Sequence, residues 1–229
     1  MRSITWIFLL ILGGCISAPV TTPHHPPAQR EDHVSGHVPN PDLQATCLVT
    51  RQAPEFTAEA VWPDNTIKPL SLSAFRGKYV VLFFYPLDFT FVCPTEIIAF
   101  DDKLQAFKDV NCEIIGISTD SQYTHLAWKK TAREEGGIGK IRYPLVADLS
   151  KRIARSFGIL HNESVALRGL FLIDPRGKVR HALINELELG RNVDEVLRTL
   201  QAVQLFDEYG ELCPANWKPG QKAIKNPSS

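Results

Sequence analysis

The sequence predicts an α/β fold in which a central mixed β-sheet is flanked by helices. Between residues 79 and 204, short continuous apolar runs alternate with segments whose apolar residues recur at helical spacing. The last part of this region reads as two strands joined by a tight turn and followed by a helix. An alternating order that ends in a hairpin and a helix is typical of a mixed sheet covered by helices.

The first half of this region predicts two buried strands, each followed by a helix. Residues 79–85 and 113–118 are apolar runs, as expected for strands that are buried on both faces. A helix is expected from Cys93 onward, since Pro94 suits a first helical turn. Apolar residues then recur on one face of that helix at Ile97, Phe100, Leu104 and Phe107. The next helix is expected over residues 121–135, before a pair of glycines.

The second half predicts a short helix, the two strands of a hairpin and a final helix, over residues 150–157, 170–173, 179–184 and 192–204. The hairpin turns at residues 174–177, where Pro and Gly occupy positions that a tight turn favours. The final helix is expected to begin after Asn192, because Glu195 follows three residues later, as in a capping box.

The composition is that of a globular protein and argues against several classes of function. The 229 residues contain 25 Lys and Arg against 25 Asp and Glu, so a nucleic-acid-binding surface is not expected. No apolar run reaches the roughly 20 residues that a membrane-spanning helix needs. Motifs for haem, flavin, nucleotide or metal are absent, so the prediction is no cofactor and no metal. The five cysteines form no C-x2-C pair, so a zinc site is not expected. Any cysteine chemistry would therefore depend on individual sulfur atoms.

The first 45 residues differ from the rest and predict export. Residues 1–15 read as a signal peptide, in which Leu12-Gly13-Gly14-Cys15 resembles the bacterial lipobox. Cys15 is therefore the candidate lipidation site, through which a lipid would anchor the chain to a membrane. Residues 16–45 read as a Pro/His-rich linker whose histidines lack a fixed geometry for a metal. The expected location is the periplasmic face of the cell envelope, lipid-anchored or secreted, with a cytoplasmic location as the alternative.

Cys93 falls where the first buried strand is followed by a helix, which is a favourable place for a reactive cysteine. Free backbone N–H groups and the positive end of the helix dipole favour the thiolate, which is the nucleophilic form. Thr90 lies three residues before the sulfur, and Pro86 can close one side of the pocket. A C-x-x-C pair is absent because Glu96 occupies the second position, so Cys93 needs a partner elsewhere.

Pro86, Thr90 and Cys93 match the pattern P-x-x-x-T-x-x-C, through which the sequence resembles the peroxiredoxins. The likeness is to the typical two-cysteine class, in the family of the alkyl hydroperoxide reductases and thiol-specific antioxidants. Further matches follow in order at residues 53–56, 84–86, 136–139, 167–171, 190–191 and 212–214. The resemblance implies a thioredoxin-like fold over residues 46–229, with an extended C-terminal tail at 205–229.

The resemblance also implies roles for the residues of the site. Cys93 is the peroxidatic cysteine, whose thiolate attacks a peroxide and becomes a sulfenic acid. Thr90, Arg168 and backbone amides near Cys93 would hold the peroxide and stabilise its leaving oxygen. Glu96 and Arg191 would complete a polar network that orients Arg168. Apart from the resemblance, a cation just before a helix N-cap is disfavoured by the dipole, so Arg191 is expected to have a local partner.

Cys213 resembles the resolving cysteine of this class, because it lies 120 residues after Cys93 (213 − 93) in a polar tail. The resemblance implies that its disulfide with Cys93 joins two subunits. A homodimer is therefore expected, and a ring of five such dimers, a decamer, is common in the family. Thioredoxin or another disulfide reductase would recycle the disulfide.

The remaining cysteines and two aromatic side chains receive other interpretations. Cys112 opens a buried strand and is expected to pack in the core, whereas Cys47 matches no motif and is given no role. His125 raises the idea of a Cys–His pair, but nothing in the spacing places it near Cys93. A position on a helix surface or an interface is expected for His125, and core packing or an interface for Trp128.

Three functions are compatible with the sequence. The favoured one is a thiol-dependent peroxidase that reduces hydrogen peroxide and organic hydroperoxides, in antioxidant defence and redox homeostasis. A holdase that binds unfolded proteins needs no Cys93 and is not excluded. A thiol–disulfide oxidoreductase that acts on proteins is disfavoured, because Glu96 stands where its second cysteine would lie.

Overall fold

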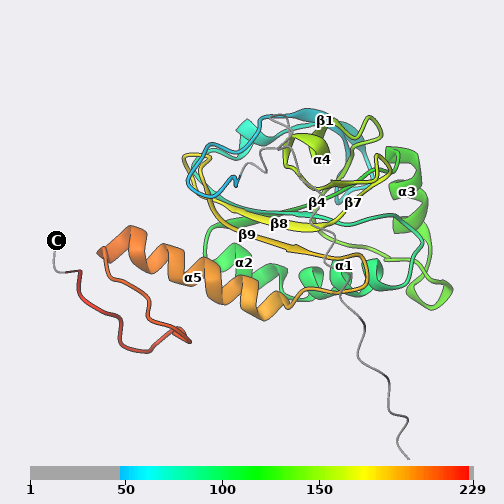
Figure 1. Cartoon of the computed structure of the whole chain (residues 1–229). Coiled ribbons are helices and arrows are strands. Elements are labelled where there is room, and N and C mark those ends of the chain that lie inside the picture. The colour runs from blue at the N-terminus through cyan, green and yellow to red at the C-terminus, as the bar shows by residue number, and fades with distance from the viewer. Residues whose placement is uncertain (1–46, 227–229) are drawn as a thin grey trace, which may run out of the picture. The chain divides into compact units, whose positions relative to one another are not determined.

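A seven-stranded mixed β-sheet organises the domain in the computed structural model, which describes residues 47–226. The strand order is β2-β1-β5-β4-β3-β8-β9, in which β3, β4 and β5 are parallel and the outer strands are antiparallel. The strands are β1 (Thr57–Val61), β2 (Ile67–Ser71), β3 (Tyr79–Phe84), β4 (Cys112–Ser118), β5 (Leu145–Ala147), β8 (Arg168–Ile173) and β9 (Val179–Asn185). A separate hairpin pairs β6 (Leu160–His161) with β7 (Val165–Ala166). The predicted mixed sheet is confirmed (Figure 1).

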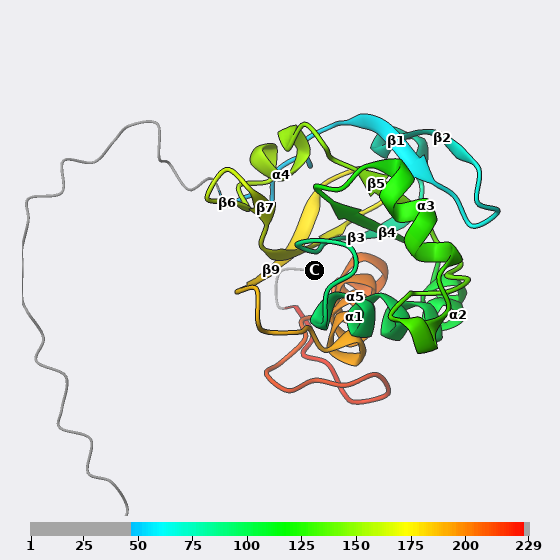
Figure 2. The same cartoon turned by 90° about the vertical axis from the view of Figure 1, so that its right-hand side faces the viewer.

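Helices cover both faces of this sheet (Figures 1 and 2). The helices are α1 (Val92–Asp102), α2 (Leu104–Asp109), α3 (Gln122–Lys130), α4 (Arg152–Ser156) and α5 (Val193–Tyr209), with 3-10 turns η2 (Leu72–Phe75) and η3 (Arg133–Glu135). Side chains of α1, α2 and α5 pack on one face and those of α4 pack on the other. α1 and the start of α5 therefore lie on the same face of β3.

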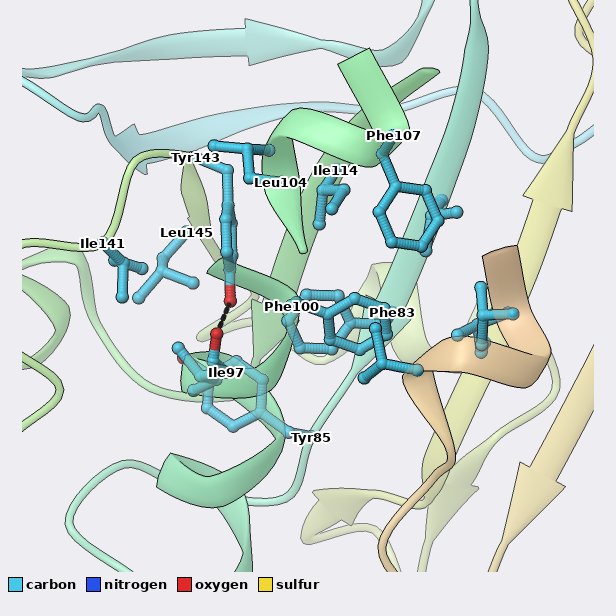
Figure 3. Packing of buried hydrophobic residues seen from close by; sticks show 14 of the residues in the cluster. Phe83, Tyr85, Ile97, Phe100, Leu104, Phe107, Ile114, Ile141, Tyr143 and Leu145 are labelled. Carbon is cyan, nitrogen blue, oxygen red and sulfur yellow. Dashed lines mark hydrogen bonds between the residues drawn. The ribbon is translucent and has the colours of Figure 1, made fainter. Parts of the chain in front are cut away.

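β3 contributes to the core on both faces, because alternate side chains of a strand point to opposite sides. Val81 and Phe83 pack toward α1 and α5, as does Tyr85 directly after the strand, whereas Val80, Leu82 and Phe84 pack toward α4. On the α1 side, the rings of Phe83 and Phe100 stack with centroids 4.5 Å apart. The Tyr143 hydroxyl donates to the Ile97 carbonyl (2.7 Å; Figure 3). Burial on both faces explains why this strand is a continuous apolar run in the sequence.

Three helix ends differ from the prediction. The helix expected from Cys93 divides at Lys103 into α1 and α2. α3 ends at Lys130 instead of residue 135, because the chain folds back until Gly137 lies against the Thr131 carbonyl, where a Cβ would come within 2.1 Å. α5 continues past residue 204 to Tyr209 and ends where Gly210 adopts a left-handed conformation (φ 67°). The tail therefore begins later than residue 205.

The sequence did not predict β1, β2, β5 or the β6–β7 hairpin. β1 and β2 carry Glu59, Lys68 and Pro69 among few apolar residues, and their burial is only partial. β5 has three residues, which is too few to show a periodic pattern. These segments are strands because they pair with neighbouring strands. Their local sequence preference for β-structure is too weak to predict them.

Two single-residue predictions are confirmed, and the N-terminal predictions lie beyond the part of the chain that the structure describes. Cys112 and Trp128 are buried in the core as predicted, and burial raises the pKa of the Cys112 thiol. The predicted signal peptide (1–15) with Cys15 and the linker (16–45) lie outside the described residues. Within residues 47–226, no helix is both long and apolar enough to cross a membrane.

Lys129 is an ionisable side chain in the packed part of α3. It is 3% exposed, and its ammonium group donates to the Trp62 carbonyl (2.6 Å). Burial lowers the pKa of Lys129 to about 8. An unfolded lysine titrates near 10.4, so the folded state binds this proton less well than the unfolded state. The free energy of unfolding that Lys129 contributes therefore rises with pH between about 8 and about 10.4.

We predict that Lys129→Met removes this pH dependence. Between pH 7 and pH 10, urea unfolding of the reduced wild-type chain should gain about 2 kcal/mol relative to the variant. Lys130→Met is the matched control, because Lys130 is the exposed neighbour on the same helix. Parallel pH profiles for wild type and Lys129→Met would show that the ammonium group is solvated.

Candidate active site

The turn between β3 and α1 places Cys93 at a helix N-terminus. β3 ends at Phe84 and α1 begins at Val92, so Cys93 lies in the first turn of the helix. Its side chain is fully buried. No side chain caps this end of α1, so the backbone amides of its first turn are available to the sulfur or to a ligand.

Pro86 and Thr90 lie on the same turn. Pro86 is buried and Thr90 is half-buried. The Thr90 hydroxyl donates to the Leu87 carbonyl (2.9 Å) and not to the sulfur. Because its proton is engaged, the Thr90 oxygen can act toward a ligand only as a hydrogen-bond acceptor.

Glu96 joins two buried arginines beside the sulfur. Arg168, on β8, uses Nη1 to donate to Glu96 Oε2 (2.7 Å) and toward Cys93 Sγ (3.4 Å). Arg191, just before α5, donates to both carboxylate oxygens of Glu96 (2.7 and 2.9 Å). Glu96, Arg168 and Arg191 are 3%, 3% and 8% exposed, so solvent screens their attraction little. The structure thus brings together Cys93 and the three side chains of the expected polar network.

Both guanidinium groups are also fixed by the backbone. Arg168 Nε donates to the Leu187 carbonyl (2.6 Å), and Arg191 Nη1 donates to the Gly169 carbonyl (2.7 Å). One carboxylate and two guanidinium groups leave this buried cluster with a formal charge of +1. A thiolate at Cys93, in contact with Arg168, brings the total to zero. The arrangement is therefore suited to hold a negative charge on or next to the sulfur.

His125 is the clearest correction to the sequence interpretation, because it is fully buried and not on a helix surface. Its Nδ1 lies 2.7 Å from Asp88 Oδ2, and its Nε2 donates to the Val146 carbonyl (3.1 Å). The Tyr85 hydroxyl donates to the other Asp88 oxygen (2.8 Å). Burial raises the pKa of Asp88, although contact with His125 opposes this. The cluster connects α3 to the turn that carries Thr90, so His125 acts on the turn and not on the sulfur.

Sequence reasoning missed Asp88 and Tyr85 as partners of His125. Asp88 lies between apolar residues in the turn, and Tyr85 belongs to the apolar run of β3. A lone carboxylate in an apolar stretch signals a buried partner, because an unpaired buried charge is costly. That signal indicates that a partner exists but does not say which residue it is.

Cys213 lies in the tail after α5 and is half-buried. Its sulfur contacts the Ala202 carbonyl of α5 (3.6 Å). Burial raises the pKa of the Cys213 thiol, Arg198 opposes this shift, and Glu211 adds to it. Cys93 and Cys213 are both free thiols, and Cys47 is exposed. Within residues 47–226, no cluster of His, Cys, Asp and Glu side chains is arranged to hold a metal ion.

A buried cysteine at a helix N-terminus, faced by a fixed arginine, defines a site for a cysteine nucleophile on this sheet. The family model "AhpC/TSA family" matches residues 49–182, and the model "C-terminal domain of 1-Cys peroxiredoxin" matches residues 202–229. The chain belongs to the AhpC/TSA family, the peroxiredoxins, and has its thioredoxin-like fold.

Individual relatives agree with this assignment. Peroxiredoxin-2 of Mus musculus is 56% identical over 178 residues, which cover 77% of this chain and 89% of the relative. The reduced 2-Cys peroxiredoxin of Plasmodium vivax is 51% identical with a TM-score of 0.78, covering 79% of this chain and 94% of that one. A third relative is Prx1a of Plasmodium yoelii, which forms an artifactual octamer when modified at its N-terminus. It is 59% identical with a TM-score of 0.67, and the match covers 75% of this chain and 98% of that one.

These relationships establish the general activity. The chain is a typical two-cysteine peroxiredoxin, a thiol-dependent peroxidase that acts in antioxidant defence as an oxidoreductase. Peroxide is its substrate, and it forms homo-oligomers.

We predict that Glu96→Gln weakens both the fold and the reaction. The two buried guanidinium groups lose their carboxylate, so the free energy of unfolding in urea should fall by about 3–5 kcal/mol. The second-order rate constant for hydrogen peroxide, measured by stopped flow, should fall by roughly 10- to 100-fold because Arg168 is no longer held beside the sulfur.

The matched control for this variant is Glu163→Gln. Glu163 forms an exposed ion pair with Arg155, so its loss should change stability by less than about 1 kcal/mol and leave the rate constant unchanged. A Glu96→Gln protein with wild-type stability and rate constant would contradict the role of the double ion pair.

Proposed function

We propose that Cys93 is the peroxidatic residue that reduces hydrogen peroxide and organic hydroperoxides. The Cys93 thiolate attacks one peroxide oxygen, and the O–O bond breaks. The sulfur is oxidised to a sulfenic acid, and the second oxygen takes up a proton and leaves as water or an alcohol. The observation that carries this proposal is the Arg168 guanidinium, 3.4 Å from the sulfur and held by Glu96.

Each neighbour of Cys93 has a defined part in this step. Arg168 stabilises the thiolate and then the negative charge that develops on the leaving oxygen, together with the amides of the first turn of α1. Thr90 accepts a hydrogen bond from the peroxide O–H, since its own proton is donated to Leu87. Pro86 closes the pocket against water. Glu96 and Arg191 act through Arg168 as positioning residues.

Cys213 of a second subunit resolves the sulfenic acid. Its sulfur attacks the sulfur of Cys93, so that an S–S bond forms and the S–O bond breaks. The departing hydroxide combines with the thiol proton as water, Cys213 is oxidised and the sulfenic sulfur is reduced. Because Cys93 is fully buried, the first turn of α1 unwinds before the two sulfur atoms meet.

The edge of the sheet supports a homodimer as the unit of this cycle. β9 is the last strand of the sheet, has seven residues without proline, and carries Ile184, which is 49% exposed. Such an edge pairs readily with a second copy, and a twofold axis makes the contact self-complementary. We assign the dimer to pairing of two β9 strands, and assembly of five dimers into a decamer follows the family pattern.

The disulfide is recycled by thioredoxin or a similar dithiol donor. One donor thiolate attacks the Cys93–Cys213 disulfide, and the second donor thiol releases the donor as its own disulfide. Two electrons thus pass from the donor to the peroxide in each cycle.

The two-cysteine cycle is tested on a non-reducing gel with intact mass, after one equivalent of hydrogen peroxide. Wild type should yield a disulfide-linked dimer, and both Cys93→Ser and Cys213→Ser should remain monomeric on the gel. Cys112→Ser is the matched control and should still form the dimer. A wild-type monomer with oxidised Cys93 would contradict resolution by Cys213, and no reaction at Cys93 would contradict the peroxidatic assignment.

We propose the periplasmic face of the cell envelope as the location, with Cys15 as the lipidated residue. The support is the lipobox-like Leu12-Gly13-Gly14-Cys15 after a short apolar segment. Labelled fatty acid should enter the wild-type chain in a bacterial host and be absent from Cys15→Ser. Labelling that survives this substitution would exclude Cys15, and an unprocessed chain in the cytoplasm would favour the alternative location.

A further inference from the structure

The tail after α5 closes into a loop beneath that helix (Figure 1). Leu212 and Ile224 pair as an antiparallel bridge, with N–H donors 2.8 and 2.9 Å from the opposite carbonyls. Between them, the Trp217 side chain is 4% exposed, and its Nε1 donates to the Gln221 carbonyl (3.1 Å). Cys213 directly follows the first residue of the bridge. The proposed resolving cysteine is thus part of an ordered loop.

Arg198 fixes this loop to α5. Its guanidinium forms two hydrogen bonds with the Glu195 carboxylate, both 2.7 Å long, which fix its orientation. The remaining nitrogen, Nη1, donates to the Trp217 carbonyl (3.0 Å). We call Arg198 and Trp217 the clasp, because together they connect the middle of the loop to the helix.

In this position the Cys213 sulfur faces its own helix. The thiol donates to the Ala202 carbonyl at 3.6 Å, so its proton and one side of the sulfur are engaged. Burial raises the pKa of Cys213, which lowers the fraction of thiolate that is able to attack a sulfenic acid. Two charged groups face the sulfur, Arg198 from α5 and Glu211 from the tail. The closed loop therefore keeps the Cys213 sulfur against its own helix.

We propose that Arg198 and Trp217 are positioning residues of the resolving step. The clasp holds Cys213 on its own α5, and it opens before the sulfur reaches Cys93 of the other subunit. The rate of disulfide formation then includes the equilibrium between closed and open clasp. This inference rests on the proposed two-cysteine cycle and adds no covalent step to it.

The test separates oxidation of Cys93 from formation of the disulfide. The full chain is reduced, mixed with one equivalent of hydrogen peroxide, quenched in acid at intervals and analysed by intact mass. Arg198→Met keeps the length of the side chain but removes every donor, and Trp217→Phe keeps a buried ring but removes the Nε1 donor. Arg155→Met is the matched control, because Arg155 also pairs with a glutamate and lies on α4.

We expect the disulfide to form faster in both variants, by about threefold to tenfold in Arg198→Met and about threefold in Trp217→Phe, the effect of losing one hydrogen bond. Sulfenic acid formation at Cys93 should keep its wild-type rate. The midpoint of the pH dependence of disulfide formation should move to lower pH in Trp217→Phe, toward a solvated thiol, because Cys213 is less buried and Arg198 keeps its charge. A substitution that affected only the stability of the fold would not shift this pH midpoint.

A disulfide rate that is unchanged or slower in both variants, with normal oxidation of Cys93, would overturn the clasp and leave the peroxidase cycle intact. Absence of the disulfide in wild type would instead overturn the two-cysteine cycle. Circular dichroism checks the fold of each variant. If Arg198→Met does not fold, Trp217→Phe decides the question alone.

Discussion

The double ion pair of Glu96 connects three elements that are distant in the sequence: α1, β8 and the start of α5. Both arginines also donate to backbone carbonyls, so each guanidinium has one orientation. Arg168 therefore faces the Cys93 sulfur before any peroxide binds, and little reorganisation is needed as charge develops. The same contacts explain why Arg191 is tolerated next to a helix N-terminus, where the dipole alone would disfavour it.

This rigid network adjoins the segment that unwinds in the proposed disulfide step. Cys93 lies in a first helical turn that no side chain caps, so unwinding this turn breaks no capping hydrogen bond. Glu96, one turn later, remains paired with its arginines. Before Cys93, the cluster of Asp88 and His125 fixes the start of the turn to α3. The movable part of the chain is thus bounded on both sides by buried charged or polar clusters, which confines the rearrangement to the residues around Cys93.

Buried elements with strong local signals were predictable, and elements that depend on partners were not. The apolar runs of β3 and β4 are long because both faces are buried, and the Asn192 side chain accepts from the Glu195 amide as its spacing predicts. β1, β2 and β5 have weak patterns, because their stability comes from pairing with neighbouring strands. The early end of α3 depends on the close approach of Gly137 to Thr131, which no helical pattern reveals.

The sequence by itself predicted that Cys93 is the reactive cysteine, with Pro86 and Thr90 nearby, and that Arg191 needs a partner. These inferences rest on residues close together in the chain, where spacing fixes geometry. The family resemblance predicted a network of Glu96, Arg168 and Arg191, but only the tertiary structure decided which carboxylate oxygen each arginine contacts and that His125 pairs with Asp88. It also decided that Arg198 holds the loop of Cys213. Each of these contacts joins residues whose proximity is produced by packing, and spacing along the chain carries no information about it.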